Sequence, residues 1–176
     1  MISLKGSHCY LRALEPEDLQ FLYTLENDTA VWEVSETLAP YSRFVLKEYL
    51  ANSHKDIYEV KQLRLAICDM SHHVVGFIDL FDFNPRHKRA GVGIVILNRD
   101  DRNKGLGRES LKLLMDYAFG VLDMHQLYAN INQDNKPSIH LFTSLGFVQS
   151  GIKKDWVLRD GEFKDELMFQ KLRDVH

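Results

Sequence analysis

The sequence predicts a mixed α/β fold, a central sheet flanked by helices. An apolar run at 92–97 is typical of a buried strand, and it leads through a glycine-containing loop into residues 107–122, whose apolar positions recur at helical spacing. Residues 125–132 alternate apolar and polar side chains like a strand, and a second helical pattern follows them. Residues 148–158 and 162–172 flank a turn and are expected to pair as antiparallel strands.

Length and composition set the scale of the molecule. At 176 residues, with 45% hydrophobic and 11% aromatic content, the chain is long enough for one well-buried core and short for two domains. No linker, repeat or low-complexity segment interrupts it, so we expect residues 1–176 to form a single domain. The net charge of -3 gives no reason to expect nucleic-acid binding.

The N-terminal elements follow from patterning and helix signals. Residues 8–14 are expected to form the first strand. Pro16 and the acidic residues after it suit the first turn of a helix, where a negative charge complements the helix dipole. Residues 29–41 are expected to be a loop or a broken helix. Ser42 is placed to cap a helix that runs through Leu50.

The middle of the chain reads as a hairpin of strands. Residues 63–69 and 74–83 are apolar strand patterns, and the polar residues at 71–73 predict the turn between them. Asn84-Pro85 ends the second of these strands.

The second helical pattern carries its own boundary signals. Asn135 is placed to cap it, Pro137 suits its first turn, and Gly146 stands where a left-handed C-terminal cap is expected. Its apolar stripe consists of Ile139, Phe142 and Leu145.

A basic, glycine-containing loop lies between the strand at 92–97 and its helix. The first turn of a helix has unpaired backbone N–H groups and the positive end of the helix dipole, so an anion such as a phosphate can bind there, and glycines let it approach closely. The spacing matches neither the Walker loop nor the dinucleotide fingerprint. Taken alone, an ordinary solvated loop is an equal alternative. The residues are Arg102, Asn103, Lys104, Gly105, Leu106, Gly107 and Arg108.

A family resemblance decides between these readings. Residues 135–147, coming after the glycine loop and its helix, resemble the coenzyme A-binding core of the GNAT acyltransferase superfamily. The resemblance extends from 10–19 to 166–169 and includes the strand patterns at 76–83 and 89–94. The chain is most similar to the spermidine acetyltransferases and to their relatives that acetylate the N-termini of ribosomal proteins.

The resemblance implies a single GNAT-type domain, whose twisted mixed sheet has splayed parallel strands, and an acetyl-CoA-dependent N-acetyltransferase. The acetyl group would pass directly to a primary amine in a ternary complex. A polyamine such as spermidine is the first expectation for the acceptor. The alternatives are a protein N-terminus or a catalytically weak acetyl-CoA-binding module.

The resemblance also assigns the coenzyme contacts. The glycine loop would hold the pyrophosphate. Backbone groups around Ile96 and Leu97, where the two parallel strands splay apart, would hold the pantetheine and direct an N–H toward the thioester carbonyl. Asn135 would contact the coenzyme, although a helix cap without a ligand explains it equally well.

The amine must lose a proton before it attacks, because an alkylammonium with a pKa near 10.4 is charged at neutral pH. Asp79 and Asp82 interrupt an otherwise apolar strand, and strand alternation places them on opposite faces, so one of them can line the cleft. Asp79 aligns with an acidic position of the similar polyamine enzymes, which implies an acceptor ligand or a water-mediated base. The alternative is a strand acid on a solvated face.

The chain departs from the family at one catalytic position. Many members place a tyrosine in the helix after the second core strand, where it protonates the departing thiolate, and this chain has Phe142 there. A thiol with a pKa near 8.5 is a tolerable leaving group, so the substitution need not abolish activity. Tyr128, on the preceding strand, is the candidate replacement acid, whereas His140 is expected to be a surface residue.

Acceptor recognition is expected in the segment around 31–36. Glu33 and Glu36, together with Asp79, would meet a cationic polyamine. The alternative is that Trp32 belongs to the core and both glutamates are exposed. The sequence leaves open a polyamine, a protein N-terminus, an amino acid or an aminoglycoside-like amine.

The remaining expectations concern compartment and partners. Cys9 and Cys68 lack disulfide-like or metal-like spacing and are expected to be buried thiols, so no metal site is assigned. The N-terminus lacks the apolar core of a signal peptide, and no stretch reaches transmembrane length. We therefore expect a cytoplasmic protein with no nucleic-acid or membrane partner, and a homo-oligomer remains open.

Overall fold

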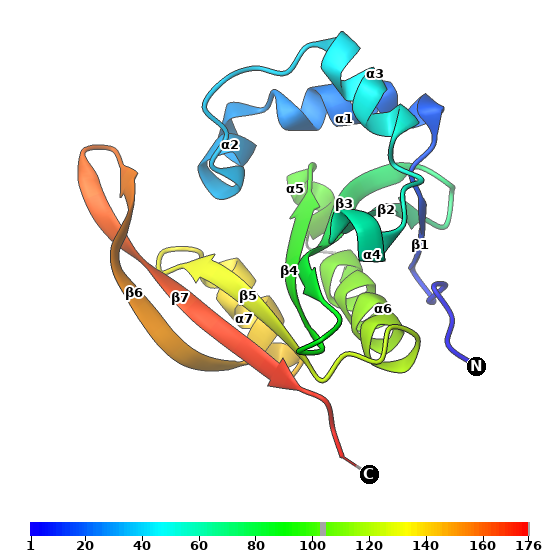
Figure 1. The fold of residues 1–176 in the computed structure, drawn as a ribbon. Coiled ribbons are helices and arrows are strands. Elements are labelled where there is room, and N and C mark those ends of the chain that lie inside the picture. Colours follow the sequence, from blue (N-terminus) through cyan, green and yellow to red (C-terminus); the bar gives the residue numbers. More distant parts are fainter. Residues whose placement is uncertain (103–104, 176) are drawn as a thin grey trace.

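The computed structural model describes residues 1–102 and 105–175, with the backbone alone at Glu33, Val34 and Arg99. Its centre is a seven-stranded sheet in the order β1-β2-β3-β4-β5-β7-β6 (Figure 1). Neighbouring strands are antiparallel except β4 and β5, which are parallel, and this confirms the predicted mixed α/β fold. The strands are β1 (Cys9–Ala13), β2 (Leu63–Asp69), β3 (Val74–Asn84), β4 (Arg89–Ile96), β5 (Gln126–Asn132), β6 (Val148–Arg159) and β7 (Glu162–Leu172).

The longer helices begin where the sequence predicts. The side chains of Ser42 and Asn135 accept hydrogen bonds from the backbone N–H groups of Val45 and Ser138, as the cap signals require. The short helices α4 and α5 were missed, because a single turn shows no apolar period. The helices are η1 (Pro16–Asp18), α1 (Leu19–Glu26), α2 (Thr29–Ser35), α3 (Arg43–Ala51), α4 (Ile57–Val60), α5 (Arg99–Arg102), α6 (Leu106–Gly120) and α7 (Lys136–Ser144).

The sheet separates two hydrophobic cores. Successive side chains of a strand point to opposite faces, so Ile78 packs into one core and Phe77 into the other. Helices α6 and α7 cover the first face, and α1, α2 and α3 cover the second (Figure 1). Cys9 and Cys68 are buried free thiols in different cores, as expected. In the described part of the chain, no helix has the length and apolar character that a membrane span needs.

Two predicted hairpin turns are present, and left-handed residues make each of them possible. His72 has a φ of 69° between β2 and β3. Asp160 and Gly161, with φ values of 50° and 78°, form the two-residue turn between β6 and β7. The turns fix the antiparallel pairing of each hairpin.

Strands β6 and β7 form a long twisted ribbon that extends beyond β5 (Figure 1). The ribbon pairs with the rest of the sheet through β7 alone among the described contacts. Several of its apolar side chains are therefore exposed: Val148, Ile152, Trp156, Leu158, Phe163 and Leu172.

Candidate functional site

The parallel strands β4 and β5 separate near the centre of the sheet. Their pairing runs from Arg89 opposite Gln126 to Gly91 opposite Tyr128 and stops there. Beyond this point β4 remains paired with β3 and β5 remains paired with β7. Each strand keeps its outer partner and loses its inner one, which leaves inner backbone groups without a strand partner. A cavity of about 100 Å³ lies in the gap.

The position of the separation corrects the sequence expectation. We expected the strands to splay around Ile96 and Leu97, but they separate directly after Gly91. The Leu97 N–H donates to the carbonyl oxygen of Val75 at 3.1 Å, so it has a protein partner. The pairing of β4 with β3 reaches Ile96, so at the end of β4 the Leu97 N–H is directed toward β3 and away from the gap.

Arg102 lies at the end of β4 and holds the chain there. It belongs to α5, and its Nε donates to the carbonyl oxygen of Ile96 at 2.9 Å. A second guanidinium nitrogen lies 3.5 Å from the carbonyl oxygen of Leu97. The side chain expected at the pyrophosphate therefore contacts two backbone carbonyls in this structure. Of the other loop residues, Asn103 and Lys104 lie outside the described part.

Helix α6 begins at Gly105, which has a φ of 75°. A side chain at this left-handed position would be strained, although a Cβ built there has nothing within 4 Å. The described residues therefore leave the space beside this Cβ position open. The first N–H groups of α6 have no partner within the helix, so the geometry suits an anion.

The three residues after Gly105 have different surroundings. The Leu106 side chain is buried in the core, so its contribution to an anion site is its backbone N–H. A Cβ at Gly107 would lie 3.5 Å from Ile96 and 3.7 Å from Leu141, which is ordinary van der Waals contact, so packing does not require a glycine there. Arg108 is exposed in the first turn of α6.

Helix α7 closes the gap from the β5 side. Asn135 caps the helix and also lines the 100 Å³ cavity, so both roles considered for it are compatible with its position. Phe142 lines the same cavity and packs edge-to-face against Phe147, with ring centroids 5.0 Å apart. The position that carries a tyrosine in many family members thus faces the gap, and here it offers no hydroxyl group.

A larger cavity, about 330 Å³, lies on the sheet face covered by α1 and α3. Asp79 of β3 lines it, and Asp79 pairs in register with Gly93 of β4, which lines the smaller cavity. Ser35 and Thr37 border the larger cavity and Glu36 borders the smaller one. The two cavities therefore adjoin across β3, β4 and the end of α2.

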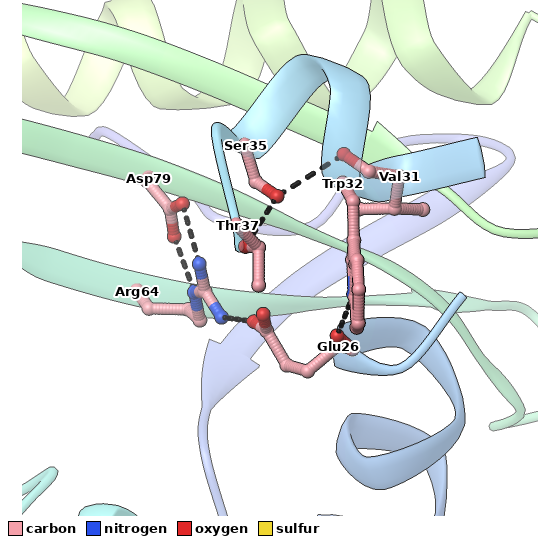
Figure 2. Close-up of polar contacts among 7 residues, drawn as sticks. All are labelled: Glu26, Val31, Trp32, Ser35, Thr37, Arg64 and Asp79. Carbon is pink, nitrogen blue, oxygen red and sulfur yellow. Dashed lines mark hydrogen bonds and ion pairs between the residues drawn. The ribbon is translucent and has the colours of Figure 1, made fainter. Parts of the chain in front are cut away.

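An arginine that the sequence analysis did not single out binds Asp79. Arg64 of β2 donates from Nε to Asp79 Oδ1 at 2.7 Å and from NH2 to Asp79 Oδ2 at 2.9 Å (Figure 2). Its third nitrogen donates to Glu26 Oε1, also at 2.7 Å. We call Glu26, Arg64 and Asp79 the Arg64 cluster. Burial by itself lowers the pKa of Arg64, but the Asp79 carboxylate outweighs it and raises the pKa above its ordinary value.

Asp82 does not behave as strand alternation predicts. The β3–β4 register shifts between Phe81 and Asn84, and Asp82 has a φ of 48°, so the strict period of two is broken there. Asp82 lies 3.4 Å from the hydroxyl of Tyr128, which donates to it. Burial, followed by the charge of Asp82, raises the pKa of Tyr128. Of the two aspartates, Asp79 lines the larger cavity.

The segment after α1 contains the two glutamates expected at the acceptor, and the structure describes the side chain of one of them. Glu36 is exposed, has a φ of 57° at the end of α2, and borders the smaller cavity. The side chain of Glu33 lies outside the described part of the chain. Trp32 is partly buried, and its indole N–H donates to the backbone carbonyl of Glu26 at 2.6 Å (Figure 2).

Sequence reasoning missed Glu26 and Arg64 and also Glu166, which lines the smaller cavity from β7. Arg64 carried a usable signal, because a charged residue in an apolar strand opposite Asp79 suggests a cross-strand ion pair. Glu26 and Glu166 carried none, since a glutamate at the end of a helix or in an exposed ribbon is ordinary.

The separated parallel strands, the open helix N-terminus and the adjoining acidic cavity together define a site for acyl transfer from a coenzyme to an amine. The family model described as acetyltransferase (GNAT) domain matches residues 8–148. The chain therefore belongs to the GNAT acetyltransferase family. It is an N-acetyltransferase that uses acetyl-CoA.

The relatives agree in sequence and in fold. The chain is 31% identical to the spermidine N(1)-acetyltransferase of Escherichia coli strain K12 over 89% of this chain and 82% of the relative. It is 29% identical to the enzyme of that name from Vibrio cholerae serotype O1, over 91% and 90% of the two chains. The crystal structure of spermidine N-acetyltransferase from Vibrio cholerae with CoA and spermine superposes with a TM-score of 0.83, at 28% identity, covering 95% of this chain and 96% of that one.

Proposed function

We propose that this enzyme transfers the acetyl group of acetyl-CoA to a primary amine of a polyamine, with spermidine as the first acceptor. The observation that carries the proposal is the acidic 330 Å³ cavity, which adjoins the gap between β4 and β5 from the other face of the sheet. Carboxylates in this cavity favour a cationic acceptor. The similarity to enzymes named spermidine N-acetyltransferase supports the same choice.

The coenzyme would lie along the gap. Its pyrophosphate would meet the first N–H groups of α6 beside Gly105 and the side chain of Arg108, which is exposed in the first turn. The pantetheine would then run between β4 and β5, whose inner backbone groups lack a strand partner. Asn135 borders this path.

The reaction needs a neutral amine held against the thioester. The neutral amine nitrogen attacks the carbonyl carbon and a C–N bond forms. As the tetrahedral adduct collapses, the nitrogen loses a further proton to solvent, the C–S bond breaks, and the sulfur leaves as a thiolate. Protonating Asp79 would remove the charge that pairs with Arg64 and weaken the bidentate hydrogen bonds, so we assign Asp79 to binding the ammonium group, which loses its proton to solvent. Tyr128, whose hydroxyl donates to Asp82 in this structure, is the proposed acid for the thiolate.

The test is to incubate the protein with acetyl-CoA and a panel of amines while free thiol is measured. The panel contains spermidine, spermine, a peptide with a free N-terminus, an amino acid and an aminoglycoside. We expect spermidine or spermine to give the highest kcat/KM. If the peptide exceeds both by tenfold or more, the polyamine assignment is wrong, and release of thiol without any acetylated amine would contradict transfer.

We also propose that the protein is a homo-oligomer. A dodecameric structure of the Vibrio cholerae spermidine N-acetyltransferase superposes with a TM-score of 0.77 at 27% identity, and the ribbon of β6 and β7 exposes apolar side chains here. Native mass spectrometry that finds a monomer alone would contradict this. The cytoplasmic location stays a prediction.

A further inference from the structure

We infer that Arg64 is a positioning residue that holds Glu26 and Asp79 as a fixed pair of carboxylates for the ammonium group of the acceptor. The inference rests on the proposed function, because it concerns the same acceptor cavity. The inference adds Arg64 to the proposed acceptor site, as a residue that contacts the two carboxylates and affects the acceptor through them.

The guanidinium group joins three separate elements. Arg64 lies on β2, Asp79 on β3 and Glu26 at the end of α1, and one planar group donates to both carboxylates (Figure 2). A lysine has a single nitrogen and cannot reproduce this fork. The Arg64 side chain is 25% exposed, so its contacts are only partly screened by water.

The surroundings restrict how the cluster can move. The Arg64 guanidinium lies 5.4 Å from the ring centroid of Phe77 and 5.9 Å from that of Tyr49. The indole N–H of Trp32 holds the backbone of Glu26. The second carboxylate oxygen of Glu26 has no hydrogen-bond partner among the described residues, so it remains available to a ligand.

Charge explains why the arginine matters for a cationic acceptor. Glu26 and Asp79 carry two negative charges and Arg64 carries one positive charge, so the cluster as a whole is negative by one charge and attracts one ammonium group. Tyr49 of α3 also faces the cluster, and burial raises its pKa, so it stays neutral. Without Arg64, two carboxylates would face each other across a partly buried cavity. Repulsion of this kind raises the pKa of one member of such a pair.

The experiment compares wild type with Arg64→Met, which keeps an apolar stem and removes the charge. We expect the KM for spermidine to rise at least tenfold at pH 8, with kcat within threefold and the affinity for acetyl-CoA unchanged. We also expect the ratio of variant to wild-type KM to increase further as the pH falls from 8 to 6, because one of the two unpaired carboxylates then binds a proton. Arg64→Lys should recover part of the loss.

Arg12→Met is the matched control. Arg12 lies on β1 and also forms a bidentate pair, donating from NH1 and NH2 to Asp18 at 2.9 and 2.8 Å, outside the acceptor cavity. We expect this variant to lose thermal stability while its KM for spermidine stays within twofold of wild type at every pH.

The outcomes separate the inference from the proposed function. If wild type acetylates a different amine best, the proposed acceptor is wrong, and the variants are then compared with that amine. The inference is overturned if Arg64→Met and Arg12→Met affect KM alike, or if Arg64→Met lowers kcat with KM unchanged and independent of pH. Should Arg64→Met fail to fold, Arg64→Lys decides, since it must raise KM by at least threefold with kcat preserved.

Discussion

At the scale of single residues, the contacts of Asp79 decide which role it is given. A carboxylate that accepts two hydrogen bonds from one guanidinium is a well-placed ligand for a cation and a hindered proton acceptor. The sequence left both roles open, because nothing in a strand pattern indicates that a partner lies on the neighbouring strand. We therefore propose the ligand role for Asp79.

Asp79→Asn tests this role. The amide keeps the size of the side chain and removes its charge, so we expect the KM for spermidine to rise by about tenfold, with kcat reduced less than fivefold, since one charged contact is worth ~1.5–3 kcal/mol. Steady-state kinetics between pH 6 and 9 measure both constants. A fall in kcat of more than a hundredfold, with loss of the dependence of kcat on pH, would instead establish Asp79 as the base.

Phe142→Tyr tests whether the missing hydroxyl limits the reaction. The Phe142 ring is 2% exposed, packs on Phe147 and borders the gap between β4 and β5. A general acid contributes roughly 10²–10⁴-fold where it acts, but a thiolate is already a tolerable leaving group. We therefore expect kcat to change by less than about threefold, which a thiol-release assay measures. An increase above tenfold would mean that thiolate departure limits wild type and that Tyr128 does not supply the proton.

At the scale of elements, the start of α6 and the separation of β4 from β5 create the coenzyme path. A glycine in the left-handed conformation is the N-cap of α6, and the first N–H groups of the helix have no partner within it. The sequence predicts this strand, loop and helix order because each has its own periodicity. The sequence analysis placed the separation of β4 and β5 around Ile96 and Leu97, whereas their pairing ends at Gly91. The point of separation depends on the positions of β5 and β7, which are distant in sequence from β4.

Gly105→Asp tests the helix N-terminus as the pyrophosphate site, and Gly161→Asp is its control. Both glycines have a similar φ, 75° and 78°, and a Cβ at either position has open space around it. Each substitution should cost ~1 kcal/mol of stability through backbone strain. We expect Gly105→Asp alone to weaken acetyl-CoA binding, by at least tenfold in calorimetry, because it places a negative charge beside the phosphates. Equal affinities in the two variants would contradict the assignment.

At the scale of the whole molecule, one carboxylate ties the N-terminal segment to α6. Glu109 accepts hydrogen bonds from the backbone N–H groups of Ser7, His8 and Cys9 at 2.7 to 2.9 Å. Burial opposes its ionisation, but these N–H groups outweigh that effect and lower the pKa of Glu109 to about 2. Burial, followed by the neighbouring Glu109 carboxylate, raises the pKa of the Cys9 thiol to about 12. Glu109 thereby joins the first strand to the helix that begins the coenzyme site.

Glu109→Gln is expected to lower the free energy of unfolding at pH 7 by ~1–2 kcal/mol, because the neutral amide accepts these hydrogen bonds less strongly. The folded pKa lies below the usual 4.5, so the contribution is complete above about pH 5 and is lost as the pH falls toward 2. Urea unfolding at pH 7 and pH 3 measures the difference. Asp116→Asn breaks an exposed ion pair on the same helix and should change the free energy of unfolding by less than ~0.5 kcal/mol. A difference that is the same at both pH values would contradict this account.

The sequence by itself determined the features that depend on neighbouring residues. The caps at Ser42 and Asn135, the turns at His72 and Asp160-Gly161, and the order of strands and helices all arise from local backbone preferences and apolar periodicity. The GNAT resemblance depended on local motifs of the same kind, a glycine loop and a helix at a fixed spacing. Each of these features involves residues that are close together in the sequence.

The tertiary structure decided what depends on residues far apart in the chain. Arg64 and Glu26 lie 38 residues apart in the sequence. They meet because α1 packs on the sheet face to which β2 contributes side chains. The bulge that turns Asp82 toward Tyr128 and the point where β4 leaves β5 likewise depend on the partners each strand finds. The sequence gives the charge of each side chain. Which oppositely charged side chain it pairs with is determined only when folding brings the two within hydrogen-bond distance.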